Sequence, residues 1–114
     1  MIKIICLGKL KEKYLQELVN DYASRISKYH KIEIIELKDE EDLEKEASNI
    51  LKYIEAKDYV ITLEIEGKTL DSPTLAKLLD ETFSHYSTIS FVIGSSTGLS
   101  KRVKDRSNYN LSFS

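Results

Sequence analysis

The sequence predicts one α/β domain over residues 1–114: a mainly parallel five-stranded sheet with helices on both faces. Two observations predict this fold class. Short runs rich in isoleucine, valine and phenylalanine alternate with segments whose apolar residues recur at helical spacing. The chain is also 41% hydrophobic and 32% charged, which is the ordinary composition of a globular domain. Strand–helix–strand succession implies right-handed crossovers, so the strands are expected to be parallel.

Five short β-rich runs, the last of them weaker than the others, are expected to be the strands. They are Ile2–Leu7, Ile32–Leu37, Tyr59–Ile65, Ile89–Ile93 and Asn110–Phe113. Continuous apolar runs of this length, bounded by glycine or polar residues, are typical of strands buried on both faces.

Four segments are expected to be helices. The first covers residues 14–26, and the second follows Asp39, a predicted N-cap that places residues 40–42 at the positive helix start. The third opens at the pair Ser72-Pro73, because proline is favoured at the first helical position. The fourth runs from Ser100 to about Ser107. The expected inward-facing residues of the second and third helices are Leu43, Ala47, Ile50, Leu51, Ile54, Leu75, Leu78, Leu79 and Phe83.

Charge and cysteine content exclude several classes of function. The net charge of −2 argues against a generally basic nucleic-acid coat. Cys6 is the only cysteine, which excludes an internal disulfide and a cysteine-rich metal site. No run approaches the roughly 20 apolar residues that cross a bilayer. We expect a cytoplasmic protein with no metal and no membrane contact.

Two groups of cations are candidates for contacting an RNA backbone. Lys9 and Lys11 follow the first strand, while Lys101 and Arg102 open the fourth helix, which also carries Lys104 and Arg106. Together they would form a basic rim suited to phosphates on an otherwise acidic molecule. The alternative is an ordinary charged helix surface.

The segment FVIGSSTGLS, residues 91–100, is a candidate ligand site. It is a buried strand followed by a hydroxyl-rich loop between Gly94 and Gly98, and ligands of parallel sheets bind beyond the carboxyl ends of the strands. Glycine lets the backbone approach a ligand closely. The loop matches neither a Walker loop nor the dinucleotide fingerprint. A nucleotide or anion site and a plain tight turn both remain open.

Five segments occur in an order that carries a family resemblance: Ile4–Lys11, Val60–Lys68, Phe91–Gly94, Arg106–Tyr109 and Leu111–Ser114. Over essentially the whole chain they resemble the ribosomal RNA large subunit methyltransferase H family of the SPOUT superfamily. The resemblance implies a homodimeric enzyme with a C-terminal knot. It implies transfer of a methyl group from S-adenosylmethionine to N3 of a pseudouridine in the 23S RNA of the ribosomal large subunit, without a metal.

The resemblance also implies the cofactor-binding residues. By position, Leu63 and Gly94 match cofactor contacts, and Phe113 and Ser114 match the beginning of a third contact segment. Gly98 and Leu99 are weaker candidates from the same loop as Gly94. The catalytic residues are expected in the family's segment beyond the position of Ser114.

The chain departs from the family pattern at two places. The family usually has paired glycines where this chain has Gly94 and Ser95, so a Cβ at residue 95 would crowd the cofactor. The family also continues beyond Ser114 with a knot-closing segment, which residues 1–114 are expected to lack. We therefore expect weak or no activity from these residues. The alternatives are a non-catalytic scaffold or dimerisation unit, and a small nucleotide- or phosphate-binding module.

Overall fold

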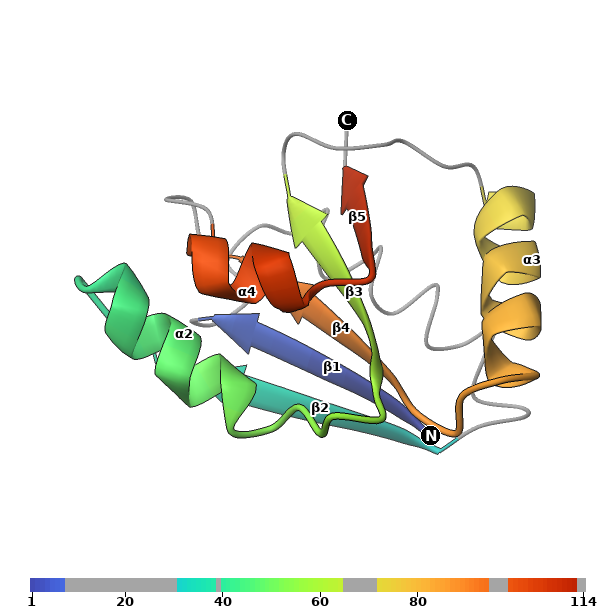
Figure 1. The fold of residues 1–114 in the computed structure, drawn as a ribbon, viewed down its shortest axis with the longest axis horizontal. Coiled ribbons are helices and arrows are strands. Elements are labelled where there is room, and N and C mark those ends of the chain that lie inside the picture. Colours follow the sequence, from blue (N-terminus) through green and yellow to red (C-terminus); the bar gives the residue numbers. More distant parts are fainter. Residues whose placement is uncertain (8–30, 39, 65–71, 95–98, 113–114) are drawn as a thin grey trace.

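A computed structural model describes residues 1–7, 31–38, 40–64, 72–94 and 99–112 (Figure 1). The elements in chain order are β1 (Ile2–Leu7), β2 (Ile32–Leu37), α2 (Leu43–Leu51), β3 (Tyr59–Glu64), α3 (Ser72–Phe83), β4 (Ile89–Ile93), α4 (Lys101–Arg106) and β5 (Tyr109–Ser112). The strands form one parallel sheet in the order β2-β1-β4-β3-β5. The predicted fold class is confirmed.

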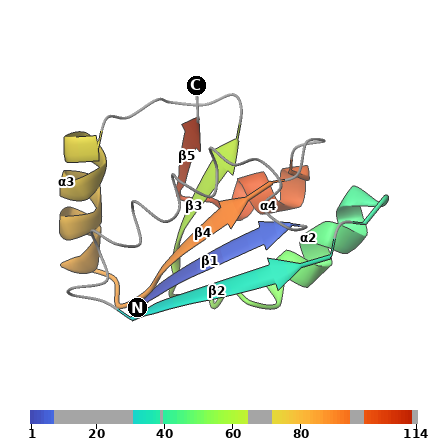
Figure 2. The same ribbon diagram turned by 180° about the vertical axis from the view of Figure 1, so that it is seen from behind.

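Helices cover both faces of the sheet, and each face carries its own apolar cluster. In Figure 1, α2 and α4 lie in front of the strands, and in Figure 2, seen from behind, the strands lie in front of them. The cluster under α2 and α4 contains Ile5, Leu7, Ala47, Ile50, Val60, Val92, Leu99 and Val103. The cluster on the other face, against which Leu78 and Phe83 of α3 pack, contains Ile2, Ile4, Cys6, Ile61, Leu63, Leu79, Ile89, Phe91 and Ile93. Successive residues of a strand point to opposite faces, so each central strand supplies both clusters.

The predicted strand boundaries hold to within one residue. β1, β2 and β4 begin and end where the apolar runs predict. β5 begins one residue early, at Tyr109, and Ile65 and Phe113 lie outside the described residues. The predicted first helix, residues 14–26, also lies outside them.

The predicted N-cap of α2 is wrong: Asp42 caps the helix, not Asp39. The Asp42 carboxylate accepts the Glu44 N–H at 2.9 Å, and its backbone carbonyl accepts the Glu46 N–H at 3.1 Å. Glu40 therefore precedes the helix, and its N–H donates to Glu46 Oε2 at 2.9 Å. Any aspartate in an acidic run can cap a helix, and the start of the apolar stripe at Leu43 selects Asp42.

Candidate functional site

The exits of three neighbouring strands meet at the carboxyl edge of the sheet. Leu63 of β3 lies opposite Ile93 of β4 on one side and opposite Leu111 of β5 on the other. Gly94 follows Ile93 directly, and Phe113 follows the last described residue of β5. Neighbouring strands lie about 4.8 Å apart, so the three exits fall within about 10 Å. The fold therefore brings together the strand ends from which the predicted cofactor-binding segments leave.

This edge offers backbone groups above a buried apolar core. Leu63 and Ile93 are 7% and 2% exposed and belong to the cluster shared with α3. Half-buried Gly94 has no Cβ and lies at the end of β4, between β1 and β3. Among the described residues, no group of three His, Cys, Asp or Glu side chains is placed to hold a metal ion. The described part of this edge therefore offers a ligand backbone groups at three neighbouring strand ends.

The loop after Gly94 is only partly described. Ser95 and Gly98 lie outside the described residues, as do Phe113 and Ser114. Leu99 is 6% exposed, and its side chain packs into the cluster under α2 and α4. Its side chain therefore stabilises the core at the start of α4, and only its backbone is left to contact a ligand.

The predicted RNA-contacting cations of α4 are exposed and engaged in ion pairs. Lys101 Nζ donates to Asp105 Oδ2 at 2.8 Å, and this hydrogen bond raises the pKa of Lys101. Arg102 Nη1 lies 3.3 Å from Glu44 Oε2 and 3.2 Å from Ser48 Oγ of α2. Exposed pairs of this kind contribute little stability, so phosphates can displace the carboxylates at small cost. Lys9 and Lys11 lie outside the described residues.

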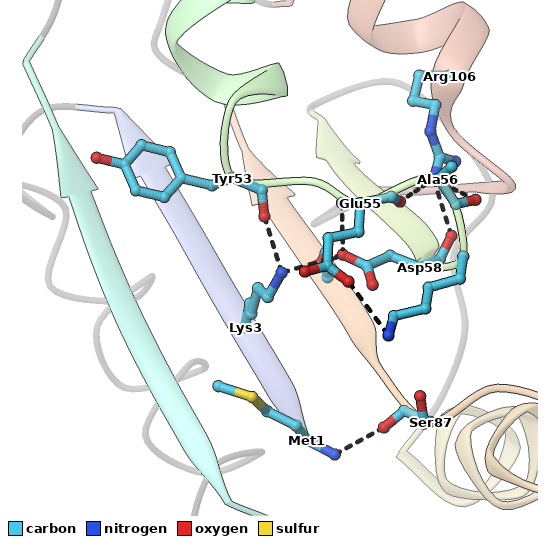
Figure 3. A network of polar contacts seen from close by, with 10 residues as sticks. Met1, Lys3, Tyr53, Glu55, Ala56, Asp58, Ser87 and Arg106 are labelled. Carbon is cyan, nitrogen blue, oxygen red and sulfur yellow. Dashed lines mark hydrogen bonds and ion pairs between the residues drawn. The ribbon is translucent and has the colours of Figure 1, made fainter.

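Arg106 differs from the other cations of α4 because its guanidinium turns toward the sheet (Figure 3). Nη2 donates to the backbone carbonyls of Glu55 at 2.8 Å, Asp58 at 3.0 Å and Ala56 at 3.4 Å. Nη1 donates to Asn108 Oδ1 at 3.4 Å. Sequence reasoning grouped Arg106 with the surface cations and missed this role, since nothing local distinguishes it from Lys104.

A buried ion pair lies at the opposite, amino-terminal edge of the sheet (Figure 3). Asp58 Oδ2 accepts from Lys3 Nζ at 3.1 Å, from the Glu55 N–H at 3.0 Å and from Ser90 Oγ at 3.3 Å. Lys3 Nζ also donates to the carbonyl of Tyr53 at 2.9 Å. This network joins β1, β4 and the segment before β3, so its role is structural. The signal in the sequence was a lysine inside an otherwise apolar strand.

Comparison with known proteins assigns the family. The family model described as "Predicted SPOUT methyltransferase" matches residues 1–114. The chain is similar to the ribosomal RNA large subunit methyltransferase H of Streptococcus agalactiae, with 48% identity over 98% of this chain and 79% of the relative. It is also similar to the enzyme of the same name from Caldicellulosiruptor saccharolyticus, with 43% identity over 100% of this chain and 80% of the relative.

A further similar protein of that name, from Streptococcus pneumoniae, is 45% identical over 98% of this chain and 79% of its own length. Of the helices in the described ranges, none is long and apolar enough to span a bilayer. The parallel five-stranded sheet, the order of the sequence segments and these similarities agree with one another. The chain therefore belongs to the SPOUT methyltransferases, in the family of ribosomal RNA large subunit methyltransferase H.

Proposed function

We propose that this chain transfers a methyl group from S-adenosylmethionine to N3 of a pseudouridine in large-subunit ribosomal RNA. The observation that carries the proposal is the alignment of three strand exits, with Leu63 opposite both Ile93 and Leu111. We further propose that residues 1–114 form one domain, that the enzyme is a cytoplasmic homodimer and that it acts on the ribosome. The similarity to ribosomal RNA methyltransferases supports an RNA substrate.

The described residues fit a bound S-adenosylmethionine. The cofactor supplies a methyl group on a positively charged sulfur, which a nucleophilic nitrogen can displace. Gly94 leaves room for close approach because a Cβ is absent at the end of β4, between two neighbouring strands. Leu63 packs into the core beneath the site, and the strand ends supply backbone donors and acceptors. The function of this edge is to hold the methyl donor and the acceptor nitrogen in line. Such positioning by itself can greatly lower the activation barrier of methyl transfer.

Cofactor binding is the first test. Titration calorimetry of the chain with S-adenosylmethionine and with S-adenosylhomocysteine is expected to give saturable heat for both. Inorganic phosphate, added as a competitor, is expected to leave the binding of S-adenosylhomocysteine unchanged. No binding at about 1 mM, which corresponds to about −4 kcal/mol, would support the non-catalytic scaffold instead. Competition by phosphate would support the phosphate-binding module.

Replacing Gly94 by valine is expected to weaken cofactor binding by at least about tenfold, or about 1.4 kcal/mol. The branched side chain would occupy the space through which the ligand approaches the end of β4. The control is Lys52→Ala, at the exposed C-cap of α2, which is expected to bind with wild-type affinity. Equal affinities for the two variants, measured by calorimetry, would remove Gly94 from the site.

Methyl transfer is tested on ribosomes that lack the modification, with nucleoside mass spectrometry as the measurement. The expected product is a pseudouridine methylated at N3, found only when chain and cofactor are both present and formed at a low rate by residues 1–114. Sedimentation is expected to report twice the 13.1 kDa mass of one chain. A monomer that methylates at full rate would contradict the homodimer.

A further inference from the structure

We propose that Asn108 and Arg106 are positioning residues that fix the register of β5 on β3, and so the point at which the chain enters the cofactor site. The inference rests on the proposed function, because it concerns the third of the three strand exits. It assigns a role to the last residue of α4 and to the segment between α4 and β5, whose side chains contact β3 and the loop before it.

The register of β5 needs side-chain contacts to fix it, because the strand is short and lies at the edge of the sheet. It has four residues, and among the strands that the structure describes it pairs with β3 alone. A slip of one residue would turn every side chain of the strand to the other face and move its exit by about 3.3 Å. Leu111 lies opposite Leu63 only in the observed register.

Asn108 holds one residue of β3 by two hydrogen bonds. Its N–H donates to the Val60 carbonyl at 2.8 Å, and its Oδ1 accepts the Val60 N–H at 2.8 Å. Ser107 is still the C-cap of α4, with its N–H bonded to carbonyls of that helix. The Asn108 side chain therefore supplies the acceptor that a strand would otherwise supply. In a slipped register Ser107 or Tyr109 would face Val60, and neither side chain carries a carbonyl oxygen.

Arg106 ties this attachment to the loop before β3. Its Nη1 donates to Asn108 Oδ1 at 3.4 Å, while Nη2 donates to the carbonyls of Glu55, Ala56 and Asp58. All four of these contacts are to uncharged oxygens. The guanidinium of half-buried Arg106 therefore joins the segment that enters β3, shown in Figure 3, to the segment that enters β5.

Thr62, the residue before Leu63, also attaches β3 to β5 through its side chain. Its side chain is fully buried, and its Oγ1 donates to Asn110 Oδ1 at 3.0 Å. Thr62 Oγ1 also lies 3.2 Å from Ser107 Oγ, and Ser107 Oγ donates to the Tyr109 carbonyl at 2.8 Å. A slip of β5 would separate these partners and leave the Thr62 hydroxyl buried without them.

The test compares Asn108→Ala, Asn108→Asp and a matched control, Ile50→Val, in the core under α2. The control is expected to destabilise the fold by a similar amount without removing a hydrogen bond between β3 and the segment that enters β5. Cofactor affinity is measured by calorimetry at equal folded fraction, and amide hydrogen exchange is measured over residues 109–112. Asn108→Ala is expected to weaken binding about tenfold and to accelerate exchange in β5. Asn108→Asp is expected to restore both, because its carboxylate accepts the same N–H beside Arg106.

The outcomes separate a positioning role from a merely structural one. Equal affinities of Asn108→Ala and Ile50→Val would overturn the proposal, as would a failure of Asn108→Asp to rescue binding. If the wild-type chain binds no cofactor, the proposed function fails, and the link from register to cofactor site fails with it. The hydrogen-exchange data then still test whether Asn108 fixes the register of β5 on β3. Faster exchange in β5 for Asn108→Ala alone supports this role, and unchanged exchange excludes it.

Discussion

Replacing Asp58 by alanine is expected to lower the free energy of unfolding by about 3 kcal/mol, a large part of the stability of a small domain. The side chains of Asp58 and Lys3 are 1% and 15% exposed, and their charged atoms lie 3.1 Å apart. The substitution leaves the Lys3 ammonium poorly solvated without its partner. It also removes the acceptor of the Glu55 N–H and of the Ser90 hydroxyl. Urea denaturation followed by circular dichroism measures the loss.

A surface ion pair beside Asp58 offers the control. Lys57 and Glu55 lie 3.4 Å apart with side chains 72% and 62% exposed. Lys57→Ala is therefore expected to change stability by no more than about 0.5 kcal/mol. The double variant Lys3→Met, Asp58→Asn is expected to recover part of the loss, since it leaves no unpaired buried charge. If Asp58→Ala costs no more than Lys57→Ala, the buried pair does not stabilise the fold.

The Cys6 thiol is expected to react with a disulfide reagent at least about a thousandfold more slowly in the folded chain than in urea. Cys6 is 0% exposed at the second-last position of β1, and its thiol donates to the Ile35 carbonyl at 3.6 Å. Burial, with the nearby charge of Glu36, raises the pKa of this thiol from 9.0 to about 11. The thiolate that reacts is thus scarce as well as inaccessible. Similar labelling rates at pH 8 with and without urea would contradict this burial.

The same pKa shift predicts how stability depends on pH. The unfolded thiol loses its proton near pH 9, whereas the folded thiol keeps it to about pH 11, so the folded state binds more protons in this interval. Stability is therefore unaffected by Cys6 below pH 9 and falls as the pH rises toward 11, by about 2 to 3 kcal/mol. The measurement is the difference between the stability profiles of the wild type and Cys6→Ala. Parallel profiles would contradict the shift.

The strands of the sheet were predictable because local composition determines them. Runs such as Ile89–Ile93 are apolar throughout, and a fully buried parallel strand demands that composition. The N-cap of α2 was not predictable from the sequence, because Asp39 and Asp42 have the same capping propensity. The choice between them depends on which helix start buries Ala47 and Ile50. At the candidate site, the positions of Leu63 and Gly94 were inferred by resemblance. Their closeness to β5 follows from the strand order.

The sequence by itself determined the fold class, the order of the elements and the family. Hydrophobic periodicity and the short segments that resemble the family are both properties of neighbouring residues, so they can be read without the structure. Only the tertiary structure decided that β5 pairs with β3, that Arg106 faces the carbonyls of residues 55, 56 and 58, and that Lys3 meets Asp58. These contacts join residues about 50 positions apart, which no local pattern encodes. They form because burying the two apolar faces of one sheet brings distant polar groups together, where each must find a partner.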